Sequence, residues 1–320
     1  MANRNIIRLG TRGSLLAVTQ SKAVAAMLAP LLADKTIELL TITTSGDKQT
    51  DKPLAATGGK GLFVKEIEEQ LSDGRIDLAV HSAKDLPMEI PADLQIIAAP
   101  SRETPNDVWI GHKACTIQNL PQGACVGTSS MRRQAQLLAL RQDLVVIPLR
   151  GNIDTRLRKV SDGVVAGTFL AAAGLKRTNL LPPQAEMMPT DQFIPAAGQG
   201  TLAIQIRRND AELASLLKHL NHAPTKASLA FERAIVRRLA GNCLAPIGVC
   251  AEPRANEGGW IVRAFIATPD GRQCARAALL TDDASTNGLN ALFEPLLQAL
   301  MGRGAGAIMQ QINKLNVPHA

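Results

Sequence analysis

The amino-acid sequence predicts an α/β protein in which two α/β lobes enclose a hinged cleft and a smaller C-terminal α+β domain follows. Short apolar runs alternate with helical periods over the first two hundred or so residues, which is typical of sheets covered by helices. From about residue 219 the pattern changes to a helix, three strands and a second helix. A chain of 320 residues with 46% apolar content can build several hydrophobic cores.

The expected elements follow one another in order along the first half of the chain. Strand-like apolar runs lie at residues 6–10, 37–44, 76–80, 94–99 and 124–130, and helical periods lie at 14–32, 61–71 and 131–141. Their alternation predicts mostly parallel sheets with helices on their faces. Short similarities between residues 10–14 and 127–130, and between 72–74 and 161–163, suggest that one architecture occurs twice.

Two breaks rich in proline and glycine divide the chain. Residues 100–105 read PSRETP and residues 195–200 read PAAGQG, and we interpret both as crossings between lobes. The predicted domains are residues 1–100 with 200–218, residues 101–199, and residues 219–320. The last of these contains a predicted helix at 229–239, strands at 247–252, 260–267 and 273–279, and a helix at 289–300. Open sheets of this kind bind ligands beyond the carboxyl ends of their strands, in the cleft between the lobes.

Charge and composition exclude several classes of protein. The excess of 35 Lys and Arg over 28 Asp and Glu suggests an anionic partner. Nucleic acid is disfavoured as that partner, because 2% aromatic residues and no tyrosine leave few rings on which bases could stack. We expect no metal, since His219 and His222 have no further ligand pattern around them, and no membrane span, since no apolar run is long enough. Five cysteines without a CxxC pair favour reduced thiols in a cytoplasmic protein, and nothing suggests more than a monomer.

Basic residues gather at predicted turns from strand to helix. In GTRGSLLA, Arg12 precedes the N-cap Ser14. In GTSSMRRQ, residues 128–130 can cap the next helix, and Arg132 and Arg133 occupy its first turn. A positive side chain at this position opposes the helix dipole, so the pattern indicates binding of carboxylate or phosphate groups. Ordinary solvated arginines explain any one of these residues better than they explain the set.

Two further loops carry residues with chemical potential. Gly58-Gly59-Lys60-Gly61 lacks the Lys-Ser/Thr ending of a phosphate loop, and it is either a segment whose lysine closes over a bound acid or simply a mobile loop. The HSAKDLP run, residues 81–87, follows a predicted strand directly. Its His81, Ser82, Lys84 and Asp85 are either catalytic or part of a structural turn in which the aspartate caps.

Cys243 lies in LAGNCLAPIG, immediately after a predicted helix that Gly241 and Asn242 end. A free cysteine is most often a small apolar residue. Here the turn lifts the side chain clear, and Arg237 and Arg238 could stabilise its thiolate, so a reactive thiol is the alternative.

In order along the chain, the motifs GTRGSLLA, GGKGLFVKE, DLAVHSAKDLP, VGTSSMRRQ, LRGNIDTRL, AGLKR, PAAGQG, the FERA helix and GNCLAPIG resemble the porphobilinogen deaminase (hydroxymethylbilane synthase) family. The resemblance implies three domains, of which the first two are similar to periplasmic binding proteins and the third carries a cofactor cysteine. It implies a transferase of porphyrin and heme biosynthesis. Such an enzyme builds a dipyrromethane cofactor from its own substrate, adds porphobilinogen units with loss of ammonia, and releases the linear tetrapyrrole hydroxymethylbilane by hydrolysis.

The resemblance also implies roles for the residues that match its motifs. Cys243 would hold the dipyrromethane through a thioether, and Asp85 would be the catalytic carboxylate that stabilises positive charge on the reacting rings and exchanges protons. The residues expected to bind the cofactor are Ser82, Lys84, Thr128, Ser129, Arg132, Arg133, Arg150 and Gly151. Those expected to bind porphobilinogen are Arg12, Ser14, Lys60, Ser130, Arg150, Arg156, Arg177 and Gln199.

Some positions depart from the family pattern. Ala56 stands where many relatives have lysine, Ala240 where glutamate is frequent, and Asn242 and Leu244 flank the cysteine in place of a glycine and a commonly polar residue. The effects that we expect are on loop closure and the rate of cofactor loading. From a different class of function, a non-catalytic two-lobe binding protein for a small polycarboxylate would explain the arginines and the fold equally well, but would not require Asp85 and Cys243 together.

Overall fold

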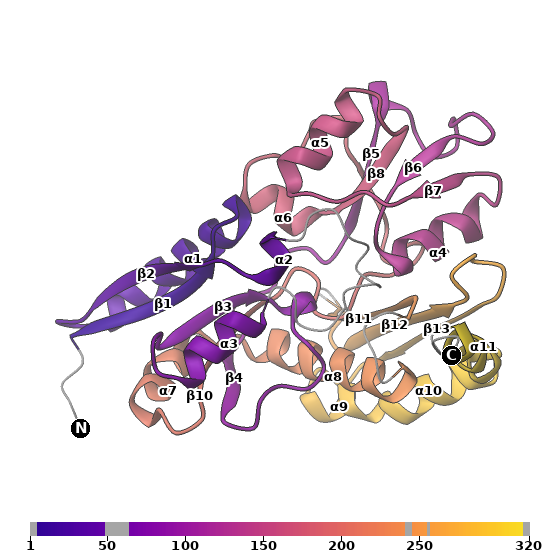
Figure 1. Ribbon diagram of the computed structural model, residues 1–320. Helices are drawn as coiled ribbons and strands as arrows, with labels where there is room; N and C mark the ends of the chain where they lie inside the picture. The colour runs from indigo at the N-terminus through magenta and orange to yellow at the C-terminus, as the bar shows by residue number, and fades with distance from the viewer. Residues whose placement is uncertain (1–4, 49–63, 241–244, 255–256, 316–320) are drawn as a thin grey trace.

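The computed structural model describes residues 5–48, 64–240, 245–254 and 257–315, and these form three β-sheets with helices packed against them. Figure 1 shows the first sheet at the left, the second at the top and the third at the lower right. No helix in these ranges is long and apolar enough to cross a membrane.

The first sheet has the strand order β2-β1-β3-β10-β4. Its strands are β1 (Ile6–Arg12), β2 (Thr36–Ile42), β3 (Leu78–Ser82), β4 (Leu94–Ala98) and β10 (Leu202–Arg207). The helices of this lobe are α1 (Leu15–Leu28), α2 (Ser45–Lys48), α3 (Lys65–Ser72) and α7 (Ala211–Leu217). Val24 of α1 and Leu213 of α7 pack on one face of the sheet, and Ile67 and Leu71 of α3 pack on the other. Both faces are therefore buried, as the sequence predicted.

The second sheet repeats this order as β7-β6-β8-β5-β9. Its strands are β5 (Asp107–Gly111), β6 (Cys125–Gly127), β7 (Val145–Ile147), β8 (Gly167–Ala171) and β9 (Glu186–Met187). The helices are α4 (Met131–Leu140), α5 (Ile153–Ser161) and α6 (Ala172–Arg177). The β1–α1 turn and the β6–α4 turn occupy matching places in the two sheets, which agrees with the duplication suggested by residues 10–14 and 127–130.

Both sheets are mixed, so the expectation of mostly parallel sheets is only partly right. β1 runs parallel to β2 and β3, but β10 is antiparallel to β3 and β4. In the second sheet β6 is parallel to β7 and β8, while β5 is antiparallel to β8 and β9. The antiparallel strands, β5 and β10, are the ones that follow the two crossings, so each crossing sends the chain into its sheet in the reverse direction.

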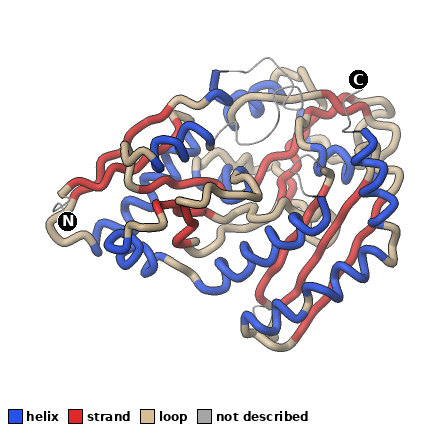
Figure 2. Tube along the Cα trace, turned by 60° about the horizontal axis from the view of Figure 1, so that its bottom comes forward, coloured by secondary structure: helices blue, strands red, loops and turns tan. Residues whose placement is uncertain are grey.

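The third sheet is antiparallel, in the order β11-β12-β13. Its strands are β11 (Ile247–Pro253), β12 (Trp260–Ala267) and β13 (Cys274–Thr281), and its helices are α8 (Ala223–Ala240), α9 (Thr286–Ala291), α10 (Phe293–Met301) and α11 (Ala305–Leu315). Figure 2 shows these strands side by side with helices along them.

The helices of this third unit differ from their predicted bounds. The helix predicted at 289–300 is divided at Leu292, because Pro295 lacks the N–H that a continuous helix would need and is tolerated only in the first turn of α10. The sequence did not predict α11, and α8 begins six residues before the predicted start at residue 229.

Candidate active site

The turns after β1 and β6 place equivalent residues at the starts of two helices. Ser14 caps α1 by accepting a hydrogen bond from the backbone N–H of Ala17, and Ser130 caps α4 by accepting one from Arg133. The predicted caps are therefore confirmed. Arg12, just before the first cap, forms an ion pair with Asp47 of α2. Burial raises the pKa of Asp47, but hydrogen bonds from Arg12 and Thr44 outweigh it, so that carboxyl has a lowered pKa.

The carboxyl end of β3 carries the HSAKD residues into a small pocket. The lining of this pocket includes Arg12, Ser14, Gln20, His81, Ser82 and Asp85. Gln20 and Ser82 share hydrogen bonds of 3.0 and 3.2 Å across the pocket wall. Asp85 ends a short 3-10 turn, Ala83–Asp85, and its side chain is exposed. The turn after β1 thus places Arg12 and Ser14 in the same pocket as Ser82 and the exposed Asp85.

His81 is held in its neutral form beside this pocket. Its ring is buried, and Nε2 lies 3.0 Å from Oε1 of Gln205, whose amide nitrogen donates in turn to Glu68 at 2.7 Å. Burial lowers the pKa of His81 to about 4. His81 therefore contributes no positive charge at neutral pH, in contrast to Lys84.

In the second lobe, Arg132 and Arg133 both bind Asp107 at the start of β5. Nη1 of Arg132 lies 2.7 Å from Oδ2 of Asp107, and Nη2 of Arg133 lies 2.7 Å from Oδ1. All three side chains are buried. Burial raises the pKa of Asp107, but the charges of the two arginines outweigh it and hold the pKa well below its ordinary value. Asp107 was not predicted from the sequence, where its only signal is an acidic residue at the head of an otherwise apolar strand.

Arg156 of α5, in the second lobe, lies within electrostatic range of Arg133. Its Nε donates to the backbone oxygen of Gly151 at 2.7 Å. Burial, with the charge of Arg133, lowers the pKa of Arg156 to about 10, and Asp85 acts in the opposite direction. Arg156 and Asp85 belong to opposite lobes, so the cleft brings the proposed carboxylate within electrostatic range of this arginine. Gly151 has a φ of 118°, and a Cβ there would lie 2.7 Å from Cγ2 of Thr155, so this turn requires glycine.

Lys84 connects the first lobe to both crossings. Its Nζ donates to Oε1 of Gln199 at 3.2 Å, and Nε2 of Gln199 donates to the backbone oxygen of Pro105 at 2.6 Å. Burial, with the charges of Arg133 and Arg132, lowers the pKa of Lys84 to about 8, although Asp85 and Asp107 raise it. Gln199 is buried and both ends of its amide bind the protein, so in this conformation it orients Lys84.

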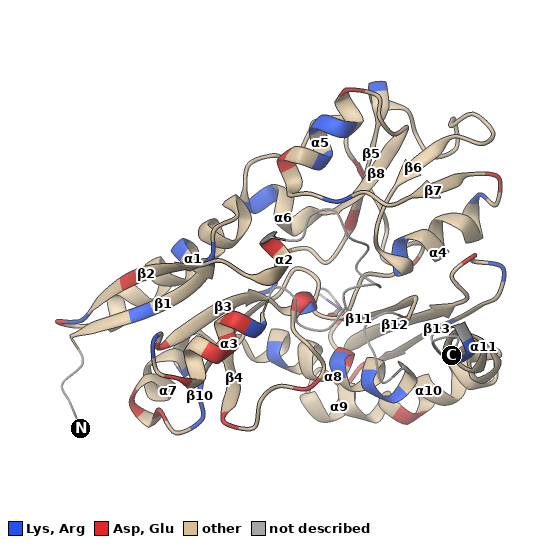
Figure 3. Ribbon diagram, in the orientation of Figure 1, with Lys and Arg blue, Asp and Glu red and all other residues tan. Residues whose placement is uncertain are grey.

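The remaining predicted residues have local partners. Arg177 donates to the backbone oxygen of Gly200 at 2.8 Å, and burial lowers its pKa. Oγ1 of Thr128 accepts the N–H of Ser130, and Oγ of Ser129 donates to the backbone oxygen of Leu149. Arg150 is half-buried after β7. Figure 3 shows that α4, α5 and α6 of the second lobe all carry basic residues. Lys60 and Cys243, with Ala56, Asn242 and Leu244, lie outside the described residues.

Lys84, Arg156 and Arg177 are cations that could bind the carboxylates of a ligand. In the part of the chain that the structure describes, Lys84, Arg156 and Arg177 form no ion pair with a carboxylate. Burial and neighbouring positive charges lower the pKa of Lys84 and Arg156, and burial lowers that of Arg177. Anionic groups placed beside Lys84 and Arg156 would relieve the repulsion from the neighbouring arginines.

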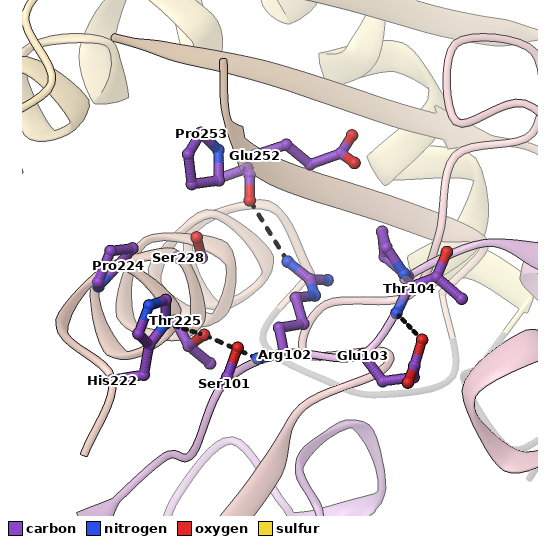
Figure 4. A pocket seen from close by; sticks show the side chains of 12 residues that line it. Ser101, Arg102, Glu103, Thr104, His222, Pro224, Thr225, Ser228, Glu252 and Pro253 are labelled. Carbon is purple, nitrogen blue, oxygen red and sulfur yellow. Dashed lines mark hydrogen bonds between the residues drawn. The ribbon is translucent and has the colours of Figure 1, made fainter. Parts of the chain in front are cut away.

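A second pocket, of about 230 Å³, lies outside this site, where the first crossing meets α8 and β11. Figure 4 shows Arg102 reaching between Thr225 and the backbone of β11. Its guanidinium binds Glu232 of α8 at 2.7 Å. None of the predicted site residues lines this pocket, and Arg102 and Glu232 connect the two lobes to the third unit.

Two family models and several relatives match this chain. The family model for the porphobilinogen deaminase, dipyromethane cofactor binding domain matches residues 7–215, and the model for the porphobilinogen deaminase C-terminal domain matches residues 227–291. A porphobilinogen deaminase from Brevibacillus brevis is 41% identical over 309 residues, which cover 97% of this chain and 98% of that protein. One from Nitratidesulfovibrio vulgaris is 42% identical over 95% of this chain and 96% of its own length.

A third relative and one solved structure extend the comparison. The porphobilinogen deaminase of Syntrophus aciditrophicus is 47% identical over 250 residues, 78% of this chain and 82% of that protein. Among solved structures, the periplasmic aliphatic sulphonate binding protein SsuA from Escherichia coli is 17% identical, with a TM-score of 0.41, over 74% of this chain and 71% of that one. Both family models and three relatives thus give one answer: the chain belongs to the porphobilinogen deaminase family, the dipyrromethane-containing enzymes of tetrapyrrole biosynthesis.

Proposed function

We propose that Asp85 is the catalytic carboxylate of this porphobilinogen deaminase and that the cations of the cleft hold the carboxylates of cofactor and substrate. The single observation that supports this most strongly is the position of Asp85. It is an exposed acid in the lining of the first-lobe pocket, and it lies within electrostatic range of Lys84 and of Arg156 from the opposite lobe.

An exposed carboxylate at this point suits the reaction. It accepts hydrogen bonds from pyrrole N–H groups, and it stabilises the positive charge that develops on the substrate ring as ammonia leaves. A dipyrromethane, when bound, would supply the terminal pyrrole to which the first substrate unit is added. The positive charges of Lys84 and Arg156 act on Asp85. His81 stays neutral, so it does not compete with these cations for the carboxylates of the substrate.

The hydroxyl groups on the second lobe complement the arginines. Thr128 and Ser130 each accept a backbone N–H at the start of α4, which leaves their hydroxyl hydrogens to donate to a ligand oxygen. Ser129 donates its hydrogen to Leu149, and Ser82 shares its hydroxyl with Gln20, so these two act less directly. We assign the acetate and propionate groups to this lobe's arginines, to Arg12 and to Lys84.

The covalent anchor is the remaining part of the proposal. We assign it to Cys243, which follows α8 and precedes β11 in the chain, and we assign closure over the bound chain to Lys60. We retain the three domains with boundaries at residues 1–100 with 200–218, 101–199 and 219–320, since each would contain one sheet. We also infer a monomer that acts in the cytoplasm on porphobilinogen.

Intact-mass measurement of the purified chain tests the anchor. The wild-type protein is expected to exceed its sequence mass by two linked pyrrole units, and Cys243→Ser is expected to show the sequence mass alone. Cys274→Ser is the matched control, because Cys274 is an exposed thiol at the start of β13, and it should retain the adduct. An adduct that persists in Cys243→Ser and disappears in Cys274→Ser would place the anchor elsewhere.

The pH dependence of kcat/KM tests the role of Lys84. Because its pKa is lowered to about 8, Lys84 is charged below that pH and loses its charge, and its hold on a carboxylate, as the pH rises through it. We expect kcat/KM to fall on a basic limb that begins near pH 8. Lys84→Arg stays charged in this range, so its profile should lack this limb. Identical profiles for both enzymes would exclude Lys84 as the titrating group.

A further inference from the structure

Asp107 differs from the other charged groups of the cleft because two guanidinium groups converge on it. Oδ2 accepts from Nη1 of Arg132 at 2.7 Å, and Oδ1 accepts from both Nε and Nη2 of Arg133, at 2.9 and 2.7 Å. The carboxylate is fully buried at the start of β5, directly after the first crossing. It therefore has no direct contact with solvent, and its hydrogen bonds hold the two arginines in place.

The protein's own acceptors do not use every N–H group of these two arginines. Nη1 of Arg132 also donates to the backbone oxygen of Ile194 at 2.7 Å, and Nη1 of Arg133 donates to that of Phe169 at 2.8 Å. The ring of Phe193 lies 5.9 Å from the guanidinium carbon of Arg132. Among the described residues, no group accepts from Nε or Nη2 of Arg132. That edge has the fork geometry that binds a carboxylate.

Asp107 also sets the charge around Lys84. The groups that face Lys84 are Arg132 and Arg133 of α4, Asp107 of β5, and Asp85 on its own turn. Gln199 ties Lys84 to Pro105, two residues before Asp107, so the lysine and the buried carboxylate are attached to the same short segment. Removal of the Asp107 charge would leave one negative group, Asp85, facing three cations.

We propose that Asp107 is a positioning residue for this reaction, which fixes Arg132 and Arg133 so that the free edge of Arg132 meets a ligand carboxylate and which balances the charge around Lys84. The proposal rests on the binding roles proposed above for these cations. A purely structural ion pair is the alternative. It predicts that loss of Asp107 lowers stability without any specific change in substrate binding or in the titration of Lys84.

The chain offers a matched control for that alternative in Asp77. This carboxylate is also fully buried and also binds two arginines, Arg8 at 3.1 Å and Arg207 at 3.2 Å. It precedes β3, at the end of that strand opposite to Ser82. Asp77→Asn therefore breaks an equivalent pair of contacts away from the proposed site.

The experiment compares Asp107→Asn, Asp107→Glu and Asp77→Asn in the full-length chain. In Asp107→Asn and Asp107→Glu, KM for porphobilinogen should rise about tenfold, the effect of one misplaced charged hydrogen bond, while Asp77→Asn keeps the wild-type KM. Thermal unfolding measured on all three separates stability from binding. Equal KM values in the Asp107 and Asp77 variants would overturn the proposal.

Titration of Lys84 gives a readout that does not depend on turnover. In the Cys243→Ser background, which carries no anchored cofactor, acetylation of Lys84 is followed across pH by peptide mass spectrometry. Asp107→Asn should make Lys84 reactive at lower pH than in the parent, whereas Asp107→Glu, which keeps the charge, and Asp77→Asn should not. If Asp107→Asn does not fold, Asp107→Glu decides: a raised KM with unchanged Lys84 titration supports the proposal, and a wild-type KM contradicts it.

A further variant distinguishes failure of this proposal from failure of the binding roles beneath it. Arg132→Lys loses the free forked edge while Asp107 is kept. A wild-type KM in Arg132→Lys would remove the proposed role of the arginine itself. A raised KM in Arg132→Lys together with a wild-type KM in both Asp107 variants would overturn only the positioning role.

Discussion

Replacement of Asp85 by asparagine should lower kcat by about 10²–10⁴-fold, the usual contribution of a positioned acid–base group. Asparagine keeps the size of the side chain but removes the negative charge proposed to stabilise the reacting ring and the carboxylate oxygen proposed to take up its proton. Because the Asp85 side chain is exposed, the fold should be unaffected. Steady-state rates at saturating porphobilinogen, with circular dichroism to check folding, measure this effect.

Asp93→Asn is the control for the Asp85 variant. Asp93 is another exposed carboxylate of the first lobe, just before β4 and outside the pocket. Its replacement should leave kcat at the wild-type value. A wild-type kcat in Asp85→Asn would show that another group carries the chemistry.

Replacement of Glu232 by glutamine should lower the free energy of unfolding by about 3–5 kcal/mol, which is a large loss for a single substitution. Glu232 is fully buried, binds Arg102 of the first crossing at 2.7 Å, and accepts the N–H groups of Gly198 at 2.6 Å and Ala251 at 2.8 Å. A neutral amide leaves Arg102, whose side chain is only 11% exposed, without its counter-charge and turns an N–H donor toward backbone donors. Urea denaturation monitored by circular dichroism measures the difference.

Glu252→Gln provides the comparison for Glu232. Glu252 lies near the end of β11. Its side chain is 28% exposed and binds Arg263 at 3.0 Å. Partly exposed ion pairs contribute about 0–1 kcal/mol, so this variant should unfold close to the wild-type midpoint. Equal losses in the free energy of unfolding would show that the buried contact between the crossings and α8 stabilises the protein no more than a partly exposed ion pair does.

Local sequence patterns predicted the parts of the fold that depend on neighbouring residues. Ser14 and one of residues 128–130 were expected as helix caps, and Ser14 and Ser130 do cap, because an N-cap and its partner are three residues apart. The direction of β5 and β10 could not be predicted. It depends on which distant strand each one meets after its crossing, and period-two patterns are the same for parallel and antiparallel strands.

In the site, too, contacts between neighbouring residues could be predicted and contacts between distant residues could not. Turn motifs predicted that arginines would gather at the carboxyl ends of strands, since the residues that make those turns are adjacent. The partner of Arg132 and Arg133 is 25 and 26 residues away, and the residue that holds Lys84 is 115 residues away. Contacts over such separations exist only once the lobes and crossings are in place, so Asp107 and the orienting contact of Gln199 could not be predicted.

The sequence also left an enzyme and a non-catalytic binding protein as alternatives. Arginines and a two-lobe fold are compatible with either, because binding a polycarboxylate is a step that both must perform. Membership of the porphobilinogen deaminase family decides for the enzyme. It leaves the roles of individual residues as the claims to be tested.

The central claim is that Asp85 adds substrate units to a chain anchored at Cys243. Rapid mixing of the enzyme with porphobilinogen, acid quenching and intact-mass measurement test it directly. The wild-type protein is expected to pass through a series of masses, each higher by one porphobilinogen unit less ammonia, and Cys243→Ser should show no such series. For Asp85→Asn we expect no step beyond the anchored mass on the wild-type time scale, whereas the same series at the wild-type rate would contradict the account.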